Sequence, residues 1–366
     1  MIFYMKCIFP YIACLLLFFN CAKEKNKLLL SDKVFYLTES NMPILQQISE
    51  YEKIELPEEE CMASCFYVYN DTTLIIFHNN PDPYWVSIMN LNTKEIIANF
   101  LKKGSGPNEM IYCYSNLRNN RLLIDDHSLK KMVIFNIDSI ELLGQSYNPH
   151  MYWLSNDYYK SFDILTDTSF IFYNSWYLDN CGIEITKNIP ELIVTNANAN
   201  YKYEPPLDAL LVNQVNGADI LANIQDKSVC LAYYCKPQFS FLNTDLDTIK
   251  IVWGPEPMEK YEYVDRGKLG GLFPALHNEY TIRSFCSDNY IFVGNARLHN
   301  ITKEKIKEKR SHNQPEIFKF DWKGNLHARY QVSNFYELSG FSESTNTLYL
   351  TIRDEDYELN LFKVKL

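Results

Sequence analysis

The sequence predicts an all-β fold, a six-bladed β-propeller of four-stranded antiparallel blades, and three observations support this prediction. From Cys65 onward, short runs rich in Val, Ile, Tyr and Phe alternate with breaks rich in Asn, Asp, Gly and Thr, as strands and turns require. The runs group with a superperiod of about 40–55 residues, which is typical of stacked four-stranded units. Helix signals are nearly absent, and only Met42–Ile48 and Lys303–Arg310 could form short helices.

Each run of the pattern is short and β-rich. The expected strands are 66–69, 73–77, 85–91, 96–101, 111–117, 121–125, 130–137, 140–147, 158–165, 169–176, 228–234, 239–243, 248–253, 289–296, 316–322, 326–332, 347–353 and 358–366. The expected turns include Asn70-Asp71, Asn92–Lys94, Asn119-Asn120, Asp138-Ser139, Thr244-Asp245 and Lys323–Asn325. Because an open ring leaves unpaired strand edges, we expect an early strand to complete the last blade. Either 34–37 or the segment around Tyr51–Leu56 would then lie beside 358–366.

Residues 1–20 have the pattern of a bacterial lipoprotein signal peptide. Lys6 precedes an apolar run from Cys7 to Phe19, and Cys21 follows directly before polar, Lys-rich sequence. That run is shorter than the roughly 20 residues of a membrane-spanning helix. We therefore expect lipid attachment at Cys21, a polar tether over 21–31 and the propeller over 32–366. Cleavage at Cys14 would leave an apolar start, and a plain secretory signal with a chance cysteine is the alternative.

Composition excludes several classes of partner and site. The formal net charge of -10 argues against nucleic acid, whose binding depends on a basic surface. The mature part keeps Cys61, Cys65, Cys113, Cys181, Cys230, Cys235 and Cys286, an odd number at irregular spacing, which is no disulfide framework. One disulfide across neighbouring strands stays open. The pairs Cys61/Cys65 and Cys230/Cys235 lack the tight spacing of structural zinc, so we expect no metal and no cofactor.

Several segments resemble those of the TolB-like six-bladed propeller lipoproteins of Bacteroides-type bacteria. Gly104-Ser105-Gly106-Pro107-Asn108-Glu109 is similar to the family's Gly-x-Gly-Pro-Gly-Glu loop, with Asn108 in place of Gly. The strand entry Ser287–Phe292, the stretch Ile317–Asn325 and the tail with Thr347–Leu350 fit as well. The resemblance implies the propeller fold and an envelope lipoprotein, and it implies no chemistry.

Candidate polar sites have simpler structural explanations. The loop with Gly104, Gly106, Pro107 and Glu109 lacks the Lys-Ser/Thr and the helix of a phosphate-binding loop, so we expect a structural crossing between blades, with Glu109 capping backbone N–H groups. Asp125-Asp126-His127 could bind a cation or act as acid and base, yet it lies where a turn is expected. His277-Asn278-Glu279 and His299 have no spaced partner.

Two functions follow from this pattern. The first is a lipid-anchored binding or scaffold module of the cell envelope, on the outer membrane, facing the periplasm or the surface, monomeric, with a glycan, a peptide or an envelope protein as ligand. The second is a propeller hydrolase or lyase acting on glycan or peptide. No catalytic motif is recognisable, so we name no catalytic residue. An enzyme would show carboxylates, His or Tyr with perturbed pKa values at one mouth of the channel.

Overall fold

The computed structural model describes residues 32–57, 63–78, 83–126, 128–153, 161–166, 169–174, 182–187, 193–197, 218–223, 225–234, 237–245, 247–255, 263–265, 272–274, 281–295, 315–332, 336–353 and 358–366. The expected signal peptide, Cys21 and the whole tether over 21–31 therefore lie outside the described residues. No helix in the described part is long and apolar enough to cross a membrane.

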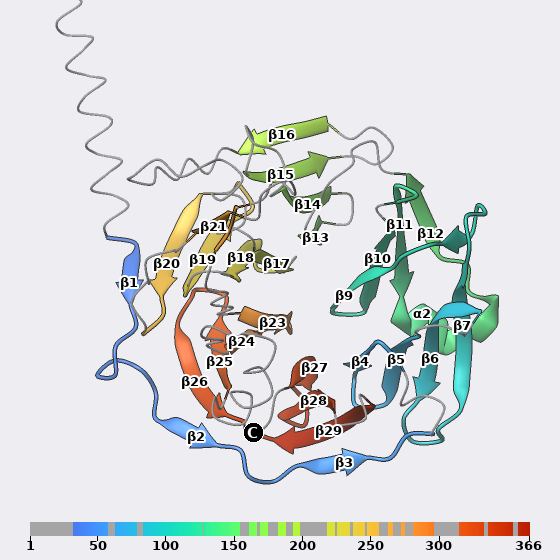
Figure 1. Cartoon of the computed structure of the whole chain (residues 1–366), viewed down its shortest axis with the longest axis horizontal. Helices are drawn as coiled ribbons and strands as arrows, with labels where there is room; N and C mark the ends of the chain where they lie inside the picture. The colour runs from blue at the N-terminus through green and yellow to red at the C-terminus, as the bar shows by residue number, and fades with distance from the viewer. Residues whose placement is uncertain are drawn as a thin grey trace, which may run out of the picture.

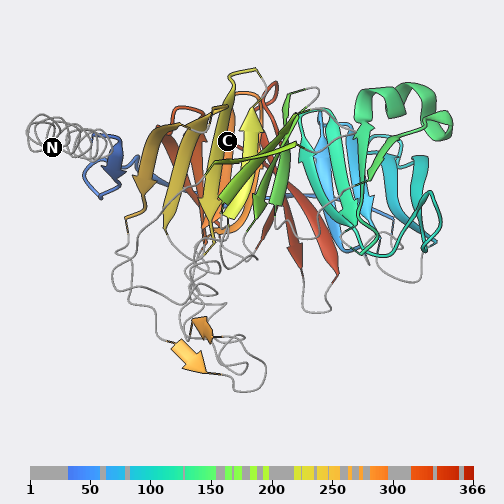
Figure 2. The same ribbon diagram turned by 90° about the horizontal axis from the view of Figure 1, so that it is seen from above.

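The strands form sheets that stand around a central axis, and the fold is an all-β propeller, as predicted (Figure 1). Within the described ranges, six sheets have four or five strands and a seventh has two. Figure 2 shows the ring from its edge, with the small hairpin of β21 (Tyr263–Asp265) and β22 (Leu272–Pro274) projecting from one side.

Sheets 1 to 3 follow one another along the chain. Sheet 1 has β4 (Cys65–Tyr69), β5 (Thr73–Phe77), β6 (Tyr84–Asn90), β7 (Ile96–Lys103) and β8 (Glu109–Met110). Sheet 2 has β9 (Tyr114–Arg118), β10 (Arg121–Asp126), β11 (Lys131–Asn136) and β12 (His150–Trp153). Sheet 3 has β13 (Ser161–Thr166), β14 (Ser169–Asn174), β15 (Gly182–Lys187) and β16 (Ile193–Ala197).

Sheets 4 to 6 each gain one strand from the N-terminal segment. Sheet 4 has β17 (Ala218–Asn223), β18 (Ser228–Tyr233), β19 (Gln238–Asn243), β20 (Thr248–Trp253) and β1 (Val34–Tyr36). Sheet 5 has β23 (Thr281–Cys286), β24 (Tyr290–Asn295), β25 (Glu316–Asp321), β26 (Leu326–Gln331) and β2 (Leu45–Gln47). Sheet 6 has β27 (Glu337–Ser342), β28 (Thr347–Arg353), β29 (Leu359–Lys365) and β3 (Glu52–Ile54).

We call residues 32–56 the strap, because they pass along the outer edges of three successive sheets (Figure 1). β1 pairs in parallel with β20, β2 in parallel with β26, and β3 antiparallel with β29. The second of the two pairings expected with 358–366 is therefore confirmed, whereas residues 34–36 lie on β20 instead. The prediction of four-stranded blades is wrong for sheets 4 and 5, where β1 and β2 add a fifth strand, and for sheet 1, where β8 does so.

The predictions of a strand at 140–147 and of a helix at 42–48 are wrong. The chain forms helix α2 (Ile137–Leu143) and a 3-10 turn, η2 (Gly144–Ser146), where a strand was expected. The Asn136 side chain accepts a hydrogen bond from the Ser139 N–H, and Gly144 ends the helix at φ 56°. The helix expected at Met42–Ile48 contains β2 instead, and Lys303–Arg310 lies outside the described residues.

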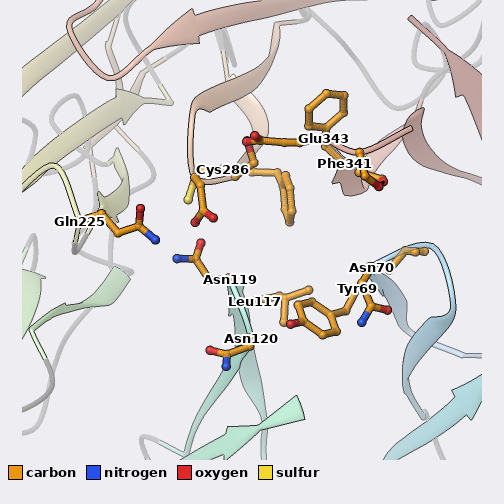
Figure 3. Close-up of a pocket in the computed structure, with 15 residues that line it drawn as sticks. Tyr69, Asn70, Leu117, Asn119, Asn120, Gln225, Cys286, Phe341 and Glu343 are labelled. Carbon is orange, nitrogen blue, oxygen red and sulfur yellow. The ribbon is translucent and has the colours of Figure 1, made fainter. Parts of the chain in front are cut away.

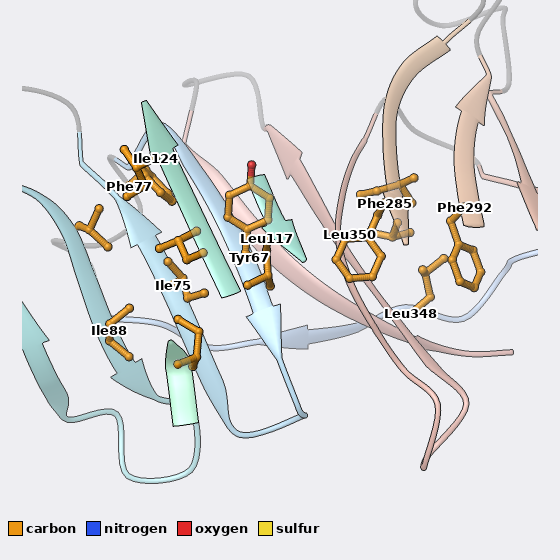
Figure 4. Packing of buried hydrophobic residues seen from close by; sticks show 14 of the residues in the cluster. Tyr67, Ile75, Phe77, Ile88, Leu117, Ile124, Phe285, Phe292, Leu348 and Leu350 are labelled. Atoms are coloured by element: carbon orange, nitrogen blue, oxygen red, sulfur yellow. The ribbon is translucent and has the colours of Figure 1, made fainter. Parts of the chain in front are cut away.

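The last sheet meets the first at a seam between β27 and β4. A Cβ built on Gly340 would lie 2.4 Å from the Val68 carbonyl oxygen, so the two backbones approach closely there. Asp71, in the turn after β4, accepts hydrogen bonds from Ser342, Thr345 and Tyr349 of sheet 6. Figure 4 shows buried side chains of this region, including Tyr67 and Ile75 of sheet 1 and Leu348 and Leu350 of sheet 6. These contacts close the ring.

Candidate functional site

A pocket of about 480 Å³ lies where the inner strands of the sheets end, around the mouth of the central channel (Figure 3). In each of these sheets a turn joins the inner strand to the second strand at the same end of the ring. Turns that are far apart in the sequence therefore lie close together. The pocket is lined by Val68, Tyr69, Asn70, Leu117, Asn119, Asn120, Gln225, Phe285, Cys286, Ser287, Asp288, Phe341, Ser342, Glu343 and Ser344.

Side-chain amides form one part of the lining, and turn chemistry explains why they are there. Asn70 has φ 47° and Asn119 has φ 50°, the left-handed region that Asn tolerates better than most residues. Asn120 donates from Nδ2 to Asp138 Oδ2 at 2.7 Å. Gln225 comes from the turn after β17 on sheet 4. The amides therefore reach the channel mouth from three different sheets.

Two carboxylates, Glu343 and Asp288, face the pocket from neighbouring sheets. The Glu343 carboxylate accepts hydrogen bonds from the backbone N–H of Asn289 at 2.9 Å and from its side-chain amide. Burial alone would raise the pKa of Glu343, but hydrogen bonds from Ser287 and Asn289 outweigh burial and lower it. Partial burial raises the pKa of Asp288, and the nearby Glu343 charge raises it further. The two carboxyl groups therefore differ in acidity.

Tyr69 contributes a hydroxyl and a ring to the same pocket. Its hydroxyl donates to Asp138 Oδ1 at 2.7 Å. Burial, together with that hydrogen bond and the negative charges around it, raises the pKa of Tyr69. Leu117, Phe285 and Phe341 supply apolar surface beside it. The pocket thus combines hydrogen-bonding amides and carboxylates with an apolar and aromatic wall.

A buried ion pair lies beside the pocket. Arg118 Nε donates to Asp163 Oδ2 at 2.5 Å, and the side chains are 8% and 0% exposed. Arg118 also donates to the carbonyl oxygen of Ile220 at 3.1 Å, and Asp163 accepts from the N–H of Ala222 at 2.7 Å. The pair therefore joins β9, β13 and β17. A smaller cavity of about 160 Å³, lined in part by Arg118, shares Asn119, Asn120 and Gln225 with the pocket.

The loop at Gly104–Glu109 joins β7 to β8 within sheet 1, next to Lys131 of sheet 2, and its residues do not line the pocket. Glu109 Oε2 accepts a hydrogen bond from the Gly106 N–H at 2.8 Å, and a Cβ built on Gly104 would meet that same oxygen. The buried Lys131 ammonium donates to the carbonyl oxygens of Gly106, Pro107 and Glu109. These contacts hold the Gly104–Glu109 loop in one conformation.

Of the Asp125-Asp126-His127 segment, Asp126 is explained by backbone contacts. Asp126 accepts four backbone N–H hydrogen bonds, which come from Ile111, Tyr112, Ser128 and Leu129. His127, His277-Asn278-Glu279, His299 and Cys21 lie outside the described residues. In the described ranges no group of three or more His, Cys, Asp or Glu side chains could hold a metal ion.

Sequence reasoning did not find the pocket, although its parts were visible. Asn70 and Asn119-Asn120 were expected as turns, and Ser287–Asn289 as the entry to a strand. Nothing in the linear pattern brings these turns together with Glu343. The signal that could have found them is the position that they share, directly after the first strand of each four-strand unit.

No protein-family model matches this sequence, and a search of curated proteins finds no match. Among solved structures, a member of the DUF4221 family from Bacteroides vulgatus is similar with a TM-score of 0.54 and 10% identity, over 87% of this chain and 98% of that chain. A putative exported protein from Bacteroides fragilis is similar with a TM-score of 0.53 and 12% identity, over 91% of this chain and 99% of that chain. At these identities the similarity shows the β-propeller fold alone.

Proposed function

We propose that this chain is a cell-envelope lipoprotein whose propeller acts as a binding module. In this proposal residues 1–20 are a signal peptide, Cys21 carries the lipid, 21–31 form a tether and 32–366 form a six-bladed, TolB-like propeller, each large sheet being one blade. The signal pattern before Cys21 supports export, and so does the similarity to a protein described as exported. The anchor would hold a monomer on the outer membrane, facing the periplasm or the surface.

The observation that carries the binding role is the pocket formed by turns of five sheets at the channel mouth. Asn and Gln side chains both donate and accept hydrogen bonds, as the hydroxyl groups of a glycan and the amide groups of a peptide do. The apolar wall with Leu117 and Phe341 offers contact to the less polar faces of such ligands. We therefore propose a glycan or a peptide as the ligand.

The alternative function is a hydrolase or lyase that acts on the same ligands. One observation favours it: environments that separate the pKa values of two carboxyl groups, as at Asp288 and Glu343, are typical of acid and base pairs. Against it, the Glu343 carboxylate is already engaged by Asn289, which gives it a structural task in the turn. Binding without turnover is therefore the first proposal.

The experiment is a screen of envelope glycans and peptides by calorimetry, followed by turnover assays on each ligand that binds. Asn119→Ala and Gln225→Ala should each weaken binding about 5–30-fold, because each loses hydrogen bonds in a partly buried pocket, at about 1–2 kcal/mol. Asn92→Ala, in a turn outside the pocket, is the matched control and should bind as the parent does.

Product formation that Asp288→Asn abolishes while binding is kept would replace the first proposal with the alternative. A ligand whose affinity is the same in the two pocket variants and in the control would show that the pocket is not its site. Labelled-palmitate incorporation that is lost in Cys21→Ala would support the anchor, and incorporation that persists would place the lipid elsewhere.

A further inference from the structure

The strap leaves apolar side chains outside the core at the rim of sheet 4. Leu37 and Ile48 of the strap are buried, and they fix it to the ring. By contrast Phe35 is 40% and Tyr36 62% exposed. These two side chains give the strap an aromatic surface at sheet 4.

The neighbouring strand continues this surface. β1 is the outermost strand of sheet 4, so its side chains flank the edge of the sheet on both faces. Ile249 of β20 is 42% exposed, and the Lys250 ammonium lies 4.8 Å from the centre of the Phe35 ring. Aromatic side chains next to lysines are typical of protein surfaces at the boundary between lipid and water. We call Phe35, Tyr36 and Ile249 the rim patch.

The rim patch lies where the tethered end of the chain joins the propeller. Lys33 directly precedes β1, and its ammonium donates a hydrogen bond to the Thr248 carbonyl oxygen at the start of β20. Only residues 22–31 separate Cys21 from the described chain, and even fully extended they span at most about 33–36 Å. A lipid on Cys21 would therefore keep this side of sheet 4 within a few nanometres of the membrane, at high effective concentration.

We propose that the rim patch contacts the phospholipid surface, so that the propeller meets the membrane with the outer edge of sheet 4. This inference rests on the proposed lipid at Cys21, which sets the nearby surface. Phe35 and Tyr36 would lie in the headgroup region, where an aromatic ring has one apolar side and a wet edge. Asp245 and Asp247 stand in the turn before β20 and offset the charge of Lys33 and Lys250. Attachment is then apolar in character and depends little on salt.

The test uses the mature chain with Cys21→Ala, which has no acyl group, and vesicles of phosphatidylethanolamine and phosphatidylglycerol. Flotation should show reversible binding that changes less than about twofold between low and high salt, since screening acts on charges alone. The double variant Phe35→Ser/Tyr36→Ser should bind vesicles about tenfold more weakly, because it removes the two aromatic side chains that would enter the headgroup region. Its thermal stability should equal that of the parent, since both side chains are exposed.

The matched control is Tyr112→Ser/Tyr114→Ser, which removes two tyrosines of 59% and 60% exposure at and just before β9 of sheet 2, outside the rim patch. It should bind vesicles as the parent does. Absence of vesicle binding by the parent, or equal loss in both double variants, would overturn the proposal. So would a parent dimer that the Phe35→Ser/Tyr36→Ser variant dissolves, since the patch would then join two copies. Palmitate labelling of the unchanged chain tests the anchor separately from the rim patch.

Discussion

Replacing Gly340 with alanine would force β27 away from β4 at the seam that closes the ring. The added Cβ would stand 2.4 Å from the Val68 carbonyl oxygen, and real Cβ atoms essentially never approach closer than 3.0 Å. The obstructing atom belongs to the backbone of a strand that is hydrogen-bonded to its neighbour, so it cannot turn aside as a side chain could. The seam must open or bend to admit the methyl group.

The cost follows from two opposed terms. Overpacking of this kind destabilises a protein by about 1–3 kcal/mol. Alanine also lowers the conformational entropy of the unfolded chain, which stabilises the folded state by about 0.4–1 kcal/mol. The net loss is about 1–2 kcal/mol. With an unfolding entropy of about 2.1 cal/mol/K per residue over about 330 residues, the melting temperature should fall by about 1–3 °C.

Differential scanning calorimetry measures this change, and hydrogen exchange locates it. Exchange should quicken at β4, at β27 and around Asp71, whose contacts with Ser342 and Tyr349 depend on the same spacing. Gly254→Ala is the control, because its Cβ meets the Pro237 side chain at 3.0 Å, away from the seam. An unchanged or higher melting temperature in Gly340→Ala would refute the argument from close approach.

Three further predictions concern buried and titrating groups. Arg118→Met should destabilise the fold by about 3–5 kcal/mol in chemical denaturation, because Asp163 is left as a buried charge without its partner, and a loss below 1 kcal/mol would show that the pair is hydrated. Burial raises the pKa of Cys286 to about 12, so this thiol should stay unmodified by iodoacetamide at about pH 8 until the protein unfolds, and rapid labelling would contradict its burial. Burial alone would raise the pKa of Asp321, but hydrogen bonds from Asn325 and His327 outweigh burial and hold this pKa below 3.8. The stability that the Asp321 carboxylate contributes is therefore present above pH 3.8 and is lost as the pH falls through the folded-state pKa. Asp321→Asn should therefore lower the melting temperature at neutral pH and reduce its decline below about pH 4, and parallel curves for variant and parent would disprove the assignment.

The propeller was predictable because strand chemistry repeats, whereas two local elements were not. Asn136 and Gly144 frame α2 with a cap at each end, yet the Ile, Glu and Leu residues between them also suit a strand. Tertiary packing decides the choice, since Ile137 and Ile140 are buried by the helix. Residues 34–36 were compatible with any exposed edge, and three-residue strands carry too little pattern to specify a partner. Pairing of Glu52–Ile54 with β29 was one of the two alternatives that ring closure predicted.

The candidate site was less predictable than the fold. Asn70, Asn119 and Asp288 each look like ordinary turn residues, and a single sequence does not tell which turns meet. The pocket depends on the ring geometry, which places the same turn of each sheet at one mouth. The Arg118–Asp163 pair was equally hidden, since its members are 45 residues apart and belong to different sheets.

The strap sets the order in which this protein can assemble. Its residues precede their partners in the chain, since Val34 pairs with Ile251 of sheet 4, Leu45 with Arg329 of sheet 5 and Lys53 with Phe362 of sheet 6. The partners are far apart in sequence, so a large loop must close before each pairing contributes any stability. Residues 34–36 therefore stay unpaired until sheet 4 has formed, residues 45–47 until sheet 5 has formed and residues 52–54 until sheet 6 has formed. A chain held by its N-terminus at a membrane would begin folding there with the strap still unpaired.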